Sequence, residues 1–441
     1  MLTGENRKQQ RMSGTSPPHL TPLRCKILPI INIPLVVDPF LMPRIQASWV
    51  RQNILKHAEL HFNSISGNGI FRHLFWAFQP CIRGFAFCKP IIEIDGTYLY
   101  GKYKGTLLMA VAQDDNSNVF PIAFALVEGE SGGGWSFFLK NFRTHVALQP
   151  CLCLISDRYA SIVSAYNNPT NGWHDSPSTH VFCIRHIVQN FTREIKDRAF
   201  RNLVMNAWYA LTQPSFKHYR REIRLSNPNA GSWIDNIPVE KWTRSYDNGQ
   251  RWGHVTTNLI ESMNGVFKGI RNLPVTTLAK STYFRMASLF AQRGERWDAV
   301  LRAGQLWSEC CTRFIKAEGA KANTHMVTTL TDITKISWSK RQSTITRGYQ
   351  DKTCVHSHLD ALTLLSPIYK SETLIHVYNN GFAVVAKEDY WPAYEGKIVG
   401  HNDQMRRNKK GRPKSKRITT EMDEFDKLER KYGLCRQVGH N

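Results

Sequence analysis

The sequence has no apolar run long enough to cross a membrane. One stretch of its 441 residues invites that interpretation, ILPIINIPLVV (27–37), but it has eleven residues and two prolines. A membrane-spanning helix needs about 20 predominantly apolar residues. The polar segment ahead of this stretch is long for a secretory signal and carries no obvious small-residue cleavage site. We therefore expect a soluble intracellular protein with no membrane partner.

Cysteines are sparse and follow no repeated spacing. The ten of them are scattered from Cys25 to Cys435, and the chain contains no internal repeats. Disulfide-stabilised secreted scaffolds are short chains with an even number of regularly spaced cysteines. The pattern therefore gives no disulfide framework and fits a protein of a reducing compartment.

Acidic residues are outnumbered by basic ones. The chain has 35 Asp and Glu against 58 Lys and Arg, which gives a formal net charge of +23. A positive field of this size attracts polyanions, either nucleic acid or an acidic membrane face. A soluble protein that is merely basic is the alternative. We take nucleic acid as the favoured partner.

The chain divides into regions that differ in apolar periodicity and in charge. Its length predicts about three domains. Residues 1–70 are weakly patterned, whereas residues 71–300 carry regular apolar periodicity that is interrupted by a basic, helical insertion over about 192–255. The pattern loosens again over 301–400, which we interpret as a degenerate linker region. Residues 401–441 form a basic tail.

Within the central region the order of elements is β-β-β-α-β. The predicted strands are IIEIDGTYLY (91–100), TLLMAVAQ (106–113), VFPIAFALVE (119–128) and CLCLISD (151–157), and WSFFLKNFRTHV (135–146) has helical spacing. GKYKG supplies a better turn than the Asp-Gly pair ahead of it, so that pair falls inside the first strand. The order is that of a ribonuclease-H-like core, an α/β fold with a mixed sheet.

Three carboxylates lie on predicted elements: Asp95 in the first strand, Asp157 at the end of the fourth, and Glu261 on a helix that we expect to start near Asn258 and end by Pro274. Two-ion phosphodiester chemistry needs hard oxygen ligands of this kind on rigid elements. Each residue also has a purely structural interpretation. Asp95 could be a hairpin turn residue, Asp157 a helix N-cap, and Glu261 a capping-box partner of Asn258.

Three motifs in the same order carry a family resemblance. IIEIDGTYLYGKYKG, LCLISDRYASI and TTNLIESMNGVFKGIRNLP together resemble the transposase domain of plant Mutator-like elements, over roughly residues 71–300. The resemblance implies a ribonuclease-H-like domain with a helical insertion, working in the nucleus on transposon ends and target DNA. It also implies metal-dependent strand cleavage and joining by an Asp-Asp-Glu triad. By motif match the triad is Asp95, Asp157 and Glu261, holding two Mg²⁺ or Mn²⁺ ions.

The motif CIRH also matches the family. Cys183 and His186 have the Cys-x-x-His spacing that the family carries between its second Asp and its Glu. As zinc ligands they would be half a site, since no second pair is evident nearby. A core cysteine beside a hydrogen-bonded histidine is the alternative. We interpret the two residues as support for the active site or as DNA contacts.

The tail holds RRNKKGRPKSKR (406–417), with eight Lys or Arg in twelve residues. Such blocks bind phosphate non-specifically, and the GRP core resembles an AT-hook that enters a narrow minor groove. A nuclear import signal or a solvated linker is the alternative. The predicted DNA-binding residues are Arg406, Arg407, Lys409, Lys410, Arg412 and Lys414.

Both ends depart from the family pattern. The last eleven residues, KYGLCRQVGHN, resemble a zinc knuckle with Cys435 and His440 in place but Tyr432 where a cysteine belongs. We therefore expect no zinc there. The N-terminal DNA-binding module of the family is not evident in residues 1–70. A truncated or degenerate copy that has lost activity is consistent with these departures.

Two other functions stay open. One is a non-catalytic DNA-binding transcription regulator of the far-red-response type, which shares this transposase ancestry. The other is a general nuclease of the same fold. The sequence does not predict the terminal repeat that is recognised, and it leaves assembly into a homo-oligomer open.

Overall fold

The computed structural model describes residues 54–62, 69–252, 258–322, 366–383, 399–400 and 405–407. The chain divides into two compact units, Met1–Met405 and Arg406–Asn441. All elements discussed below belong to the first unit. No helix in the described residues is long and apolar enough to cross a membrane.

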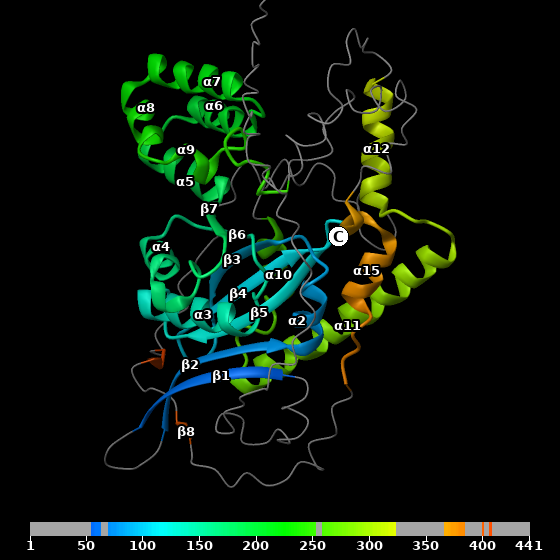
Figure 1. The fold of residues 1–441 in the computed structure, drawn as a ribbon. Coiled ribbons are helices and arrows are strands. Elements are labelled where there is room, and N and C mark those ends of the chain that lie inside the picture. Colours follow the sequence, from blue (N-terminus) through cyan, green and yellow to red (C-terminus); the bar gives the residue numbers. More distant parts are fainter. Residues whose placement is uncertain are drawn as a thin grey trace, which may run out of the picture. The chain divides into compact units, whose positions relative to one another are not determined.

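A mixed sheet forms the centre of the first unit (Figure 1). Its strand order is β1-β2-β5-β4-β3-β6-β7, with the short β8 paired to β2. Strands β3, β4 and β5 are an antiparallel meander, whereas β6 runs parallel to β3 and β7 parallel to β6. The strands are β1 (Ile54–Phe62), β2 (Gly69–Phe78), β3 (Ile91–Tyr98), β4 (Thr106–Gln113), β5 (Val119–Val127), β6 (Leu152–Ser156), β7 (Ser178–Phe182) and β8 (Val399–Gly400).

The meander confirms the strands predicted from the sequence. Every residue of β4 is buried, as expected for an apolar strand covered on both faces. Asp95 lies within β3 opposite Met109 of β4. The Asp-Gly pair is therefore not the hairpin turn, which falls between Tyr98 and Thr106. The predicted order β-β-β-α-β is present, and β1 and β2 extend the sheet beyond β5.

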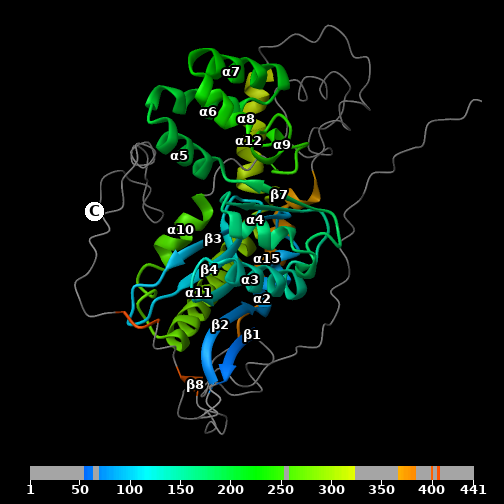
Figure 2. The same cartoon turned by 90° about the vertical axis from the view of Figure 1, so that its left-hand side faces the viewer.

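Helices cover both faces of the sheet (Figure 2). On one face Phe75 of β2 packs against Phe138 of α3. On the other face Phe124 of β5 packs edge-on against Phe267, which directly follows α10. The covering helices are α2 (Gln79–Phe85), α3 (Gly132–His145), α4 (Ala160–Asn167), α10 (Asn258–Val266), α11 (Val275–Arg302) and α15 (Ser371–Tyr378). Helix α12 (Glu309–Ala322) follows α11 and extends away from the sheet (Figure 1).

The helix predicted after the meander forms because its apolar residues share one face. Trp135, Phe138, Leu139 and Phe142 of α3 are all fully buried. The Ser131 hydroxyl accepts a hydrogen bond from the Gly134 N–H and so caps the N-terminus. This helix packs against β2 and β5 of the sheet and, beside them, against α4.

A helical insertion follows β7 and has its own hydrophobic core, which includes Phe191, Trp208 and Trp242. Two basic side chains tie it to β7: the Lys241 ammonium donates to the His180 carbonyl, and the Arg251 guanidinium donates to the Phe182 carbonyl. Its helices are α5 (Ile184–Ile195), α6 (Arg198–Tyr209), α7 (Gln213–Ser226), α8 (Pro228–Asp235) and α9 (Val239–Trp242).

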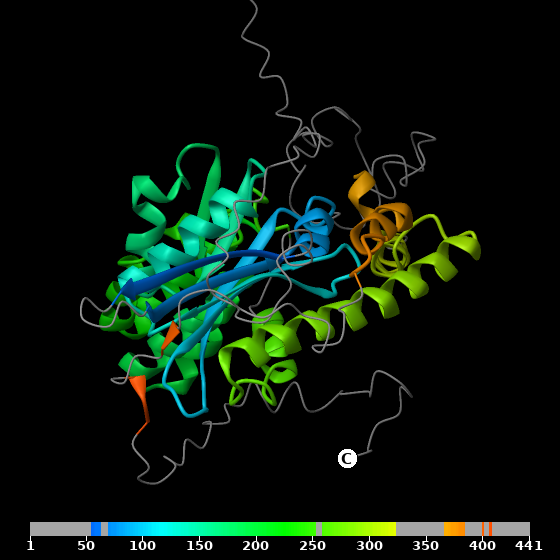
Figure 3. The same cartoon turned by 90° about the horizontal axis from the view of Figure 1, so that it is seen from below.

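Helix α15 comes from the region predicted to be a loose linker, yet it belongs to the main core (Figure 3). Leu374 and Val377 are fully buried, and α15 packs along α11. The Tyr378 hydroxyl donates to the buried Asp114 carboxylate at 2.7 Å and accepts from Arg293 at 2.8 Å. Part of the segment 301–400 is therefore folded structure, and the domain limits drawn from the sequence stay predictions.

The sequence also missed β1. Residues 54–62 were expected to be weakly structured, but they pair along their full length with β2. Ala58, Leu60 and Phe62 alternate with Glu59 and His61, which is the pattern of a half-covered strand, but Lys56 and His57 interrupt it nearer the start. As an outer strand it gains its hydrogen bonds from β2, and an apolar face is a weaker requirement there.

Candidate active site

Asp95 and Asp157 lie on neighbouring parallel strands. Strand β3 pairs with β6 in a register that matches Ile91 with Cys153 and Glu93 with Ile155. Two residues further along the same register, Asp95 stands beside Asp157. Adjacent strands are about 4.8 Å apart, so the two carboxylates leave the same edge of the sheet close together. Asp95 shares the face of Met109 and Phe124, which is the face that α10 covers.

Local backbone contacts orient both carboxylates. The Gly96 N–H donates to Asp95 Oδ1 at 2.9 Å, and the Arg158 N–H donates to Asp157 Oδ1 at 2.6 Å. The N-cap of α4 is Tyr159, whose side chain makes no capping bond. Asp157 is therefore not the cap of that helix. Both purely structural interpretations of the two aspartates are wrong.

The pKa of Asp95 is raised to about 6. Burial is the main cause, and the charges of Asp157 and Glu261 raise it further, while His186 and the Gly96 hydrogen bond act in the opposite direction. Such mutual interactions require the groups to be near one another. The structure therefore gathers Asp95, Asp157, Glu261 and His186 into one electrostatic cluster.

Glu261 lies on α10, as predicted, and its carboxylate is engaged by a basic side chain. The Arg185 guanidinium, from the first turn of α5, donates to Glu261 Oε2 and forms an ion pair with it. The Arg185 side chain is mostly buried and Glu261 is about one-third exposed. The third acid of the predicted triad thus lies close enough to raise the pKa of Asp95, but it is bound to a cation of the insertion.

Cys183 and His186 bracket the start of α5. Cys183 is buried and is the N-cap residue of the helix, with no side-chain capping bond. Burial acts to lower the pKa of His186, but hydrogen bonding to Cys183 and the charges of Asp157 and Asp95 raise it to about 9. His186 is therefore a cation at neutral pH and offsets the charge of the two aspartates. It lies at the cluster, and its supporting role stays a prediction.

Two further acids were missed in the sequence. Glu93 is buried two residues before Asp95 on the same strand face. Burial, then the charge of Cys183, raise its pKa well above the usual range, and the Ile260 backbone N–H lowers it. Glu130 follows β5, and burial, then Asp95 and Asp157, raise its pKa. The spacing in IIEID could have revealed Glu93, because residues two apart share a strand face.

The backbone of Asp157 is also held by hydrogen bonds from the neighbouring strand residues. The Ser156 hydroxyl donates to the Asp157 carbonyl at 2.7 Å and lies 2.8 Å from Nε2 of His180 on β7. His180 is buried between the Tyr166 and Phe182 rings. Burial, then the charge of Lys241, lower the pKa of His180 to about 3. A neutral histidine therefore helps to fix the backbone that carries Asp157.

The donor set is suited to hard divalent cations, because Asp95, Asp157 and Glu261 offer carboxylate oxygens on two strands and a helix. In the part of the chain that the structure describes, however, no three His, Cys, Asp or Glu side chains are grouped closely enough to hold a metal ion. Glu261 is paired with Arg185 in this structure.

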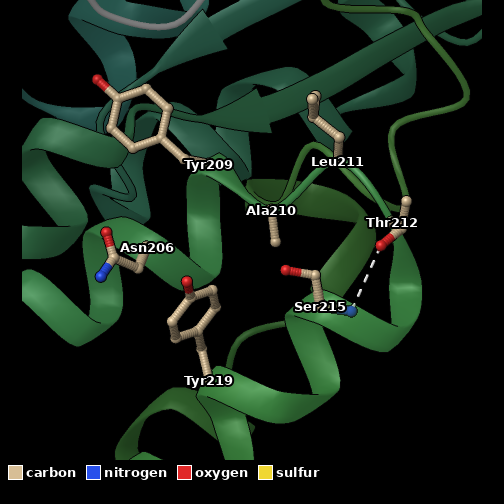
Figure 4. Close-up of a pocket in the computed structure, with 7 residues that line it drawn as sticks. All are labelled: Asn206, Tyr209, Ala210, Leu211, Thr212, Ser215 and Tyr219. Carbon is tan, nitrogen blue, oxygen red and sulfur yellow. Dashed lines mark hydrogen bonds between the residues drawn. The ribbon is translucent and has the colours of Figure 1, made fainter. Parts of the chain in front are cut away.

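A separate hollow of about 270 Å³ lies in the insertion between α6 and α7 (Figure 4). Its lining is uncharged, with the Tyr209 and Tyr219 rings beside small polar groups. Thr212 at its rim is the N-cap of α7 and accepts a hydrogen bond from the Ser215 N–H. None of the predicted site residues lines this hollow.

Arg406 and Arg407 are the two predicted DNA-binding residues that the structure describes, and both are exposed. They belong to the second unit of the chain. The other residues of the basic tail and the knuckle-like ending lie outside the described residues, namely Lys409, Lys410, Arg412, Lys414, Cys435 and His440.

Comparison with known proteins bears on the strands that carry this site. The family model of the MULE transposase domain matches residues 91–190. This segment runs from the start of β3 into α5 and includes Asp95, Asp157, Cys183 and His186. No curated protein matches the chain significantly. Residues 91–190 are thus similar to the MULE transposase domain, and this match supports a place for the chain in the Mutator-like transposase family.

Proposed function

We propose that this protein is a DNA transposase that cleaves and joins DNA strands at the edge formed by β3 and β6. The observation that carries the proposal is the strand register that sets Asp95 beside Asp157. Glu261 is the third catalytic carboxylate in this proposal, since its charge reaches Asp95 from α10.

The fold that we infer for the domain is ribonuclease-H-like. Three antiparallel strands, a helix and a parallel fourth strand support it, with sheet order β5-β4-β3-β6-β7. The positions of the acids support it as well, because one is within the first of these strands and one directly follows the fourth. The helices α5–α9 then correspond to the helical insertion that separates the second acid from the third.

The cofactor in this proposal is a pair of Mg²⁺ or Mn²⁺ ions held by Asp95, Asp157 and Glu261. Such ions, when bound, activate an attacking oxygen and stabilise the leaving oxygen of a phosphodiester. Hard oxygen donors suit both ions. The pKa of Asp95 is raised to about 6. This fits a site in which nearby protein cations do not fully balance the negative charges of the carboxylates.

In this proposal the basic side chains of the protein neutralise the carboxylates in the absence of DNA and contact the DNA backbone when it binds. Arg185 neutralises Glu261 in the DNA-free protein, and His186 offsets Asp95 and Asp157. A DNA phosphate that enters the site offers Arg185 an alternative anion, which releases Glu261. Charge-assisted bonds of Arg to phosphate are frequently bidentate and strong. Arg185 therefore orients the DNA backbone at the site.

A non-catalytic DNA-binding regulator is the second candidate. The ion pair of Glu261 with Arg185, and the lack of a ready metal cluster in the described residues, favour it. In that function the basic insertion and tail bind DNA and the carboxylates have only structural roles.

The variant Asp157→Asn separates the two candidates. Asparagine keeps the size of the side chain and its acceptor oxygen for the Arg158 N–H, but it removes a charge. Cleavage of DNA that carries candidate element ends, measured with Mn²⁺, should fall by several powers of ten. DNA binding, measured in parallel, should survive or tighten, because an anion has left the phosphate site.

Asp298→Asn is the matched control, because Asp298 is a half-exposed carboxylate on α11. It should change neither cleavage nor binding. Equal cleavage by the wild type and Asp157→Asn rejects the role of Asp157. Tight binding with no cleavage by the wild type favours the regulator.

A further inference from the structure

Exposed tyrosines flank the two aspartates. Tyr98 follows Asp95 by three residues and is 64% exposed, and Tyr159 follows Asp157 by two residues and is 52% exposed. Large aromatic rings are usually at least partly covered in a folded domain. Two such rings beside one pair of carboxylates form a surface that the fold itself does not use.

We propose that Tyr98 and Tyr159 stack on unpaired bases next to the scissile phosphate, so that the site binds DNA whose strand end is frayed or single-stranded. This inference deepens the proposed function, because it names the form of DNA that the same site takes. It concerns binding of the bases and does not require that the carboxylates be catalytic.

The two rings belong to one surface. Tyr98 shares the strand face of Gly96, two residues earlier, and a Cβ at Gly96 would lie 2.8 Å from Glu130 Oε1. The charges of Glu130 and Tyr159 accordingly raise the pKa of Tyr98. Glu130 in turn interacts with Asp95 and Asp157. Glu130 therefore connects Tyr98 to Asp95 and Asp157, although the Tyr98 side chain leaves β3 on the opposite face from Asp95.

The surroundings provide cations that hold aromatic rings. The Arg271 guanidinium lies 4.5 Å from the centre of the Tyr100 ring, and Arg271 also donates to the Thr97 hydroxyl. Arg158, between Asp157 and Tyr159, lies 5.0 Å from the Trp233 ring of the insertion. Interleaved cations and aromatic rings are the physical signature of surfaces that bind single strands, where phosphates pair with the cations and bases stack on the rings.

The charges next to the tyrosines favour bases over phosphates at this position. Glu130, Asp95 and Asp157 repel a phosphate group that approaches the rings closely, whereas a base is neutral and offers a flat π-face. In a continuous duplex both faces of a base are covered by its neighbours. A ring can stack only where a base is terminal, unpaired or turned out of the helix.

The test is equilibrium binding by fluorescence anisotropy, with the full chain and EDTA present so that no metal-dependent step takes part. The probes are a short blunt duplex and the same duplex with an unpaired 3′ extension. The wild type should bind the extended DNA more tightly. Tyr98→Ala and Tyr159→Ala should each weaken binding of the extended DNA about 5- to 150-fold, the range expected for loss of one stacked base.

The variants Tyr98→Phe and Tyr159→Phe keep the rings and should bind both probes like the wild type. Phe284→Ala removes a ring of similar exposure, 49%, from α11 and is the control for loss of an exposed aromatic. It should leave both affinities unchanged. Binding of the blunt duplex by the alanine variants should also be unchanged, which reports that they are folded.

Three results would overturn the inference. These are equal affinity of the wild type for both probes, an equal loss on both probes in the alanine variants, or phenylalanine variants as weak as the alanine ones. Because no result depends on cleavage, a protein that lacks transposase activity can still pass this test. A protein that cleaves DNA through Asp157 can fail it.

Discussion

His180 should make the stability of this domain fall in mild acid. The residue is buried beneath Asp157, and its pKa lies at about 3 in the folded protein. In the unfolded chain a histidine has a pKa near 6.5. Below that pH the histidine binds a proton in the unfolded chain, whereas His180 stays neutral in the folded protein. The resulting penalty is absent above about pH 6.5 and grows as the pH falls toward 3.

The size of the penalty follows from the difference in pKa. Each unit is worth about 1.36 kcal/mol, so at pH 5 the free energy of unfolding should be lower by about 2 kcal/mol through His180 alone. The variant His180→Gln lacks this titration. It loses the ring contact with Tyr166 and is less stable at pH 7, but it should lose less stability than the wild type on acidification.

The assay is urea unfolding of both proteins at pH 7, 6 and 5. The difference in unfolding free energy between them should shrink by about 2 kcal/mol from pH 7 to pH 5, since all other titrating groups are common to both. His218→Gln, which removes an exposed histidine of α7, should not show this convergence. A difference that stays constant across the three pH values would refute the burial argument.

Two further predictions concern α15 and the tail. Leu374→Ala should lower the unfolding free energy by about 2–5 kcal/mol, since a fully buried leucine leaves a cavity; an effect below about 0.5 kcal/mol, the size typical of surface substitutions, would mean that α15 does not belong to the core. Replacing the six basic residues of the tail by alanine should flatten the salt dependence of DNA binding, by about 0.9 in the log–log slope for each phosphate that is no longer neutralised. An unchanged slope, with Lys140→Ala on α3 as a control for loss of a surface charge, would assign the tail a linker or import role. The six residues are Arg406, Arg407, Lys409, Lys410, Arg412 and Lys414.

The local elements of the site could be predicted because short-range patterns encode them. Strand β4 is an uninterrupted apolar run, and α3 repeats its aromatic residues at helical spacing. The glycines of GKYKG mark the turn after β3 better than Asp95-Gly96 does. These patterns were sufficient to put Asp95 in a strand, Asp157 at a strand end and Glu261 on a helix.

The remaining features depend on contacts between distant parts of the chain. The ion pair of Arg185 and Glu261 joins residues 76 apart, and Glu130 reaches the aspartates from a glycine-rich segment whose local pattern indicates only a break. Helix α15 has eight residues, too few to be stable alone, and it exists through packing against α2 and α11. None of these relations has a local signature.

The bond between Asp114 and Tyr378 has a consequence for synthesis. It joins residues separated by 264 positions, and a ribosome adds about 5–20 residues per second. Tyr378 is therefore made about 13–53 s after Asp114. Until then Phe120, and Phe290 once it has been made, lack the contact with Tyr378 that they have in the finished fold. The carboxylate edge can be translated early, but the apolar surface opposite α15 is a natural substrate for chaperones during elongation.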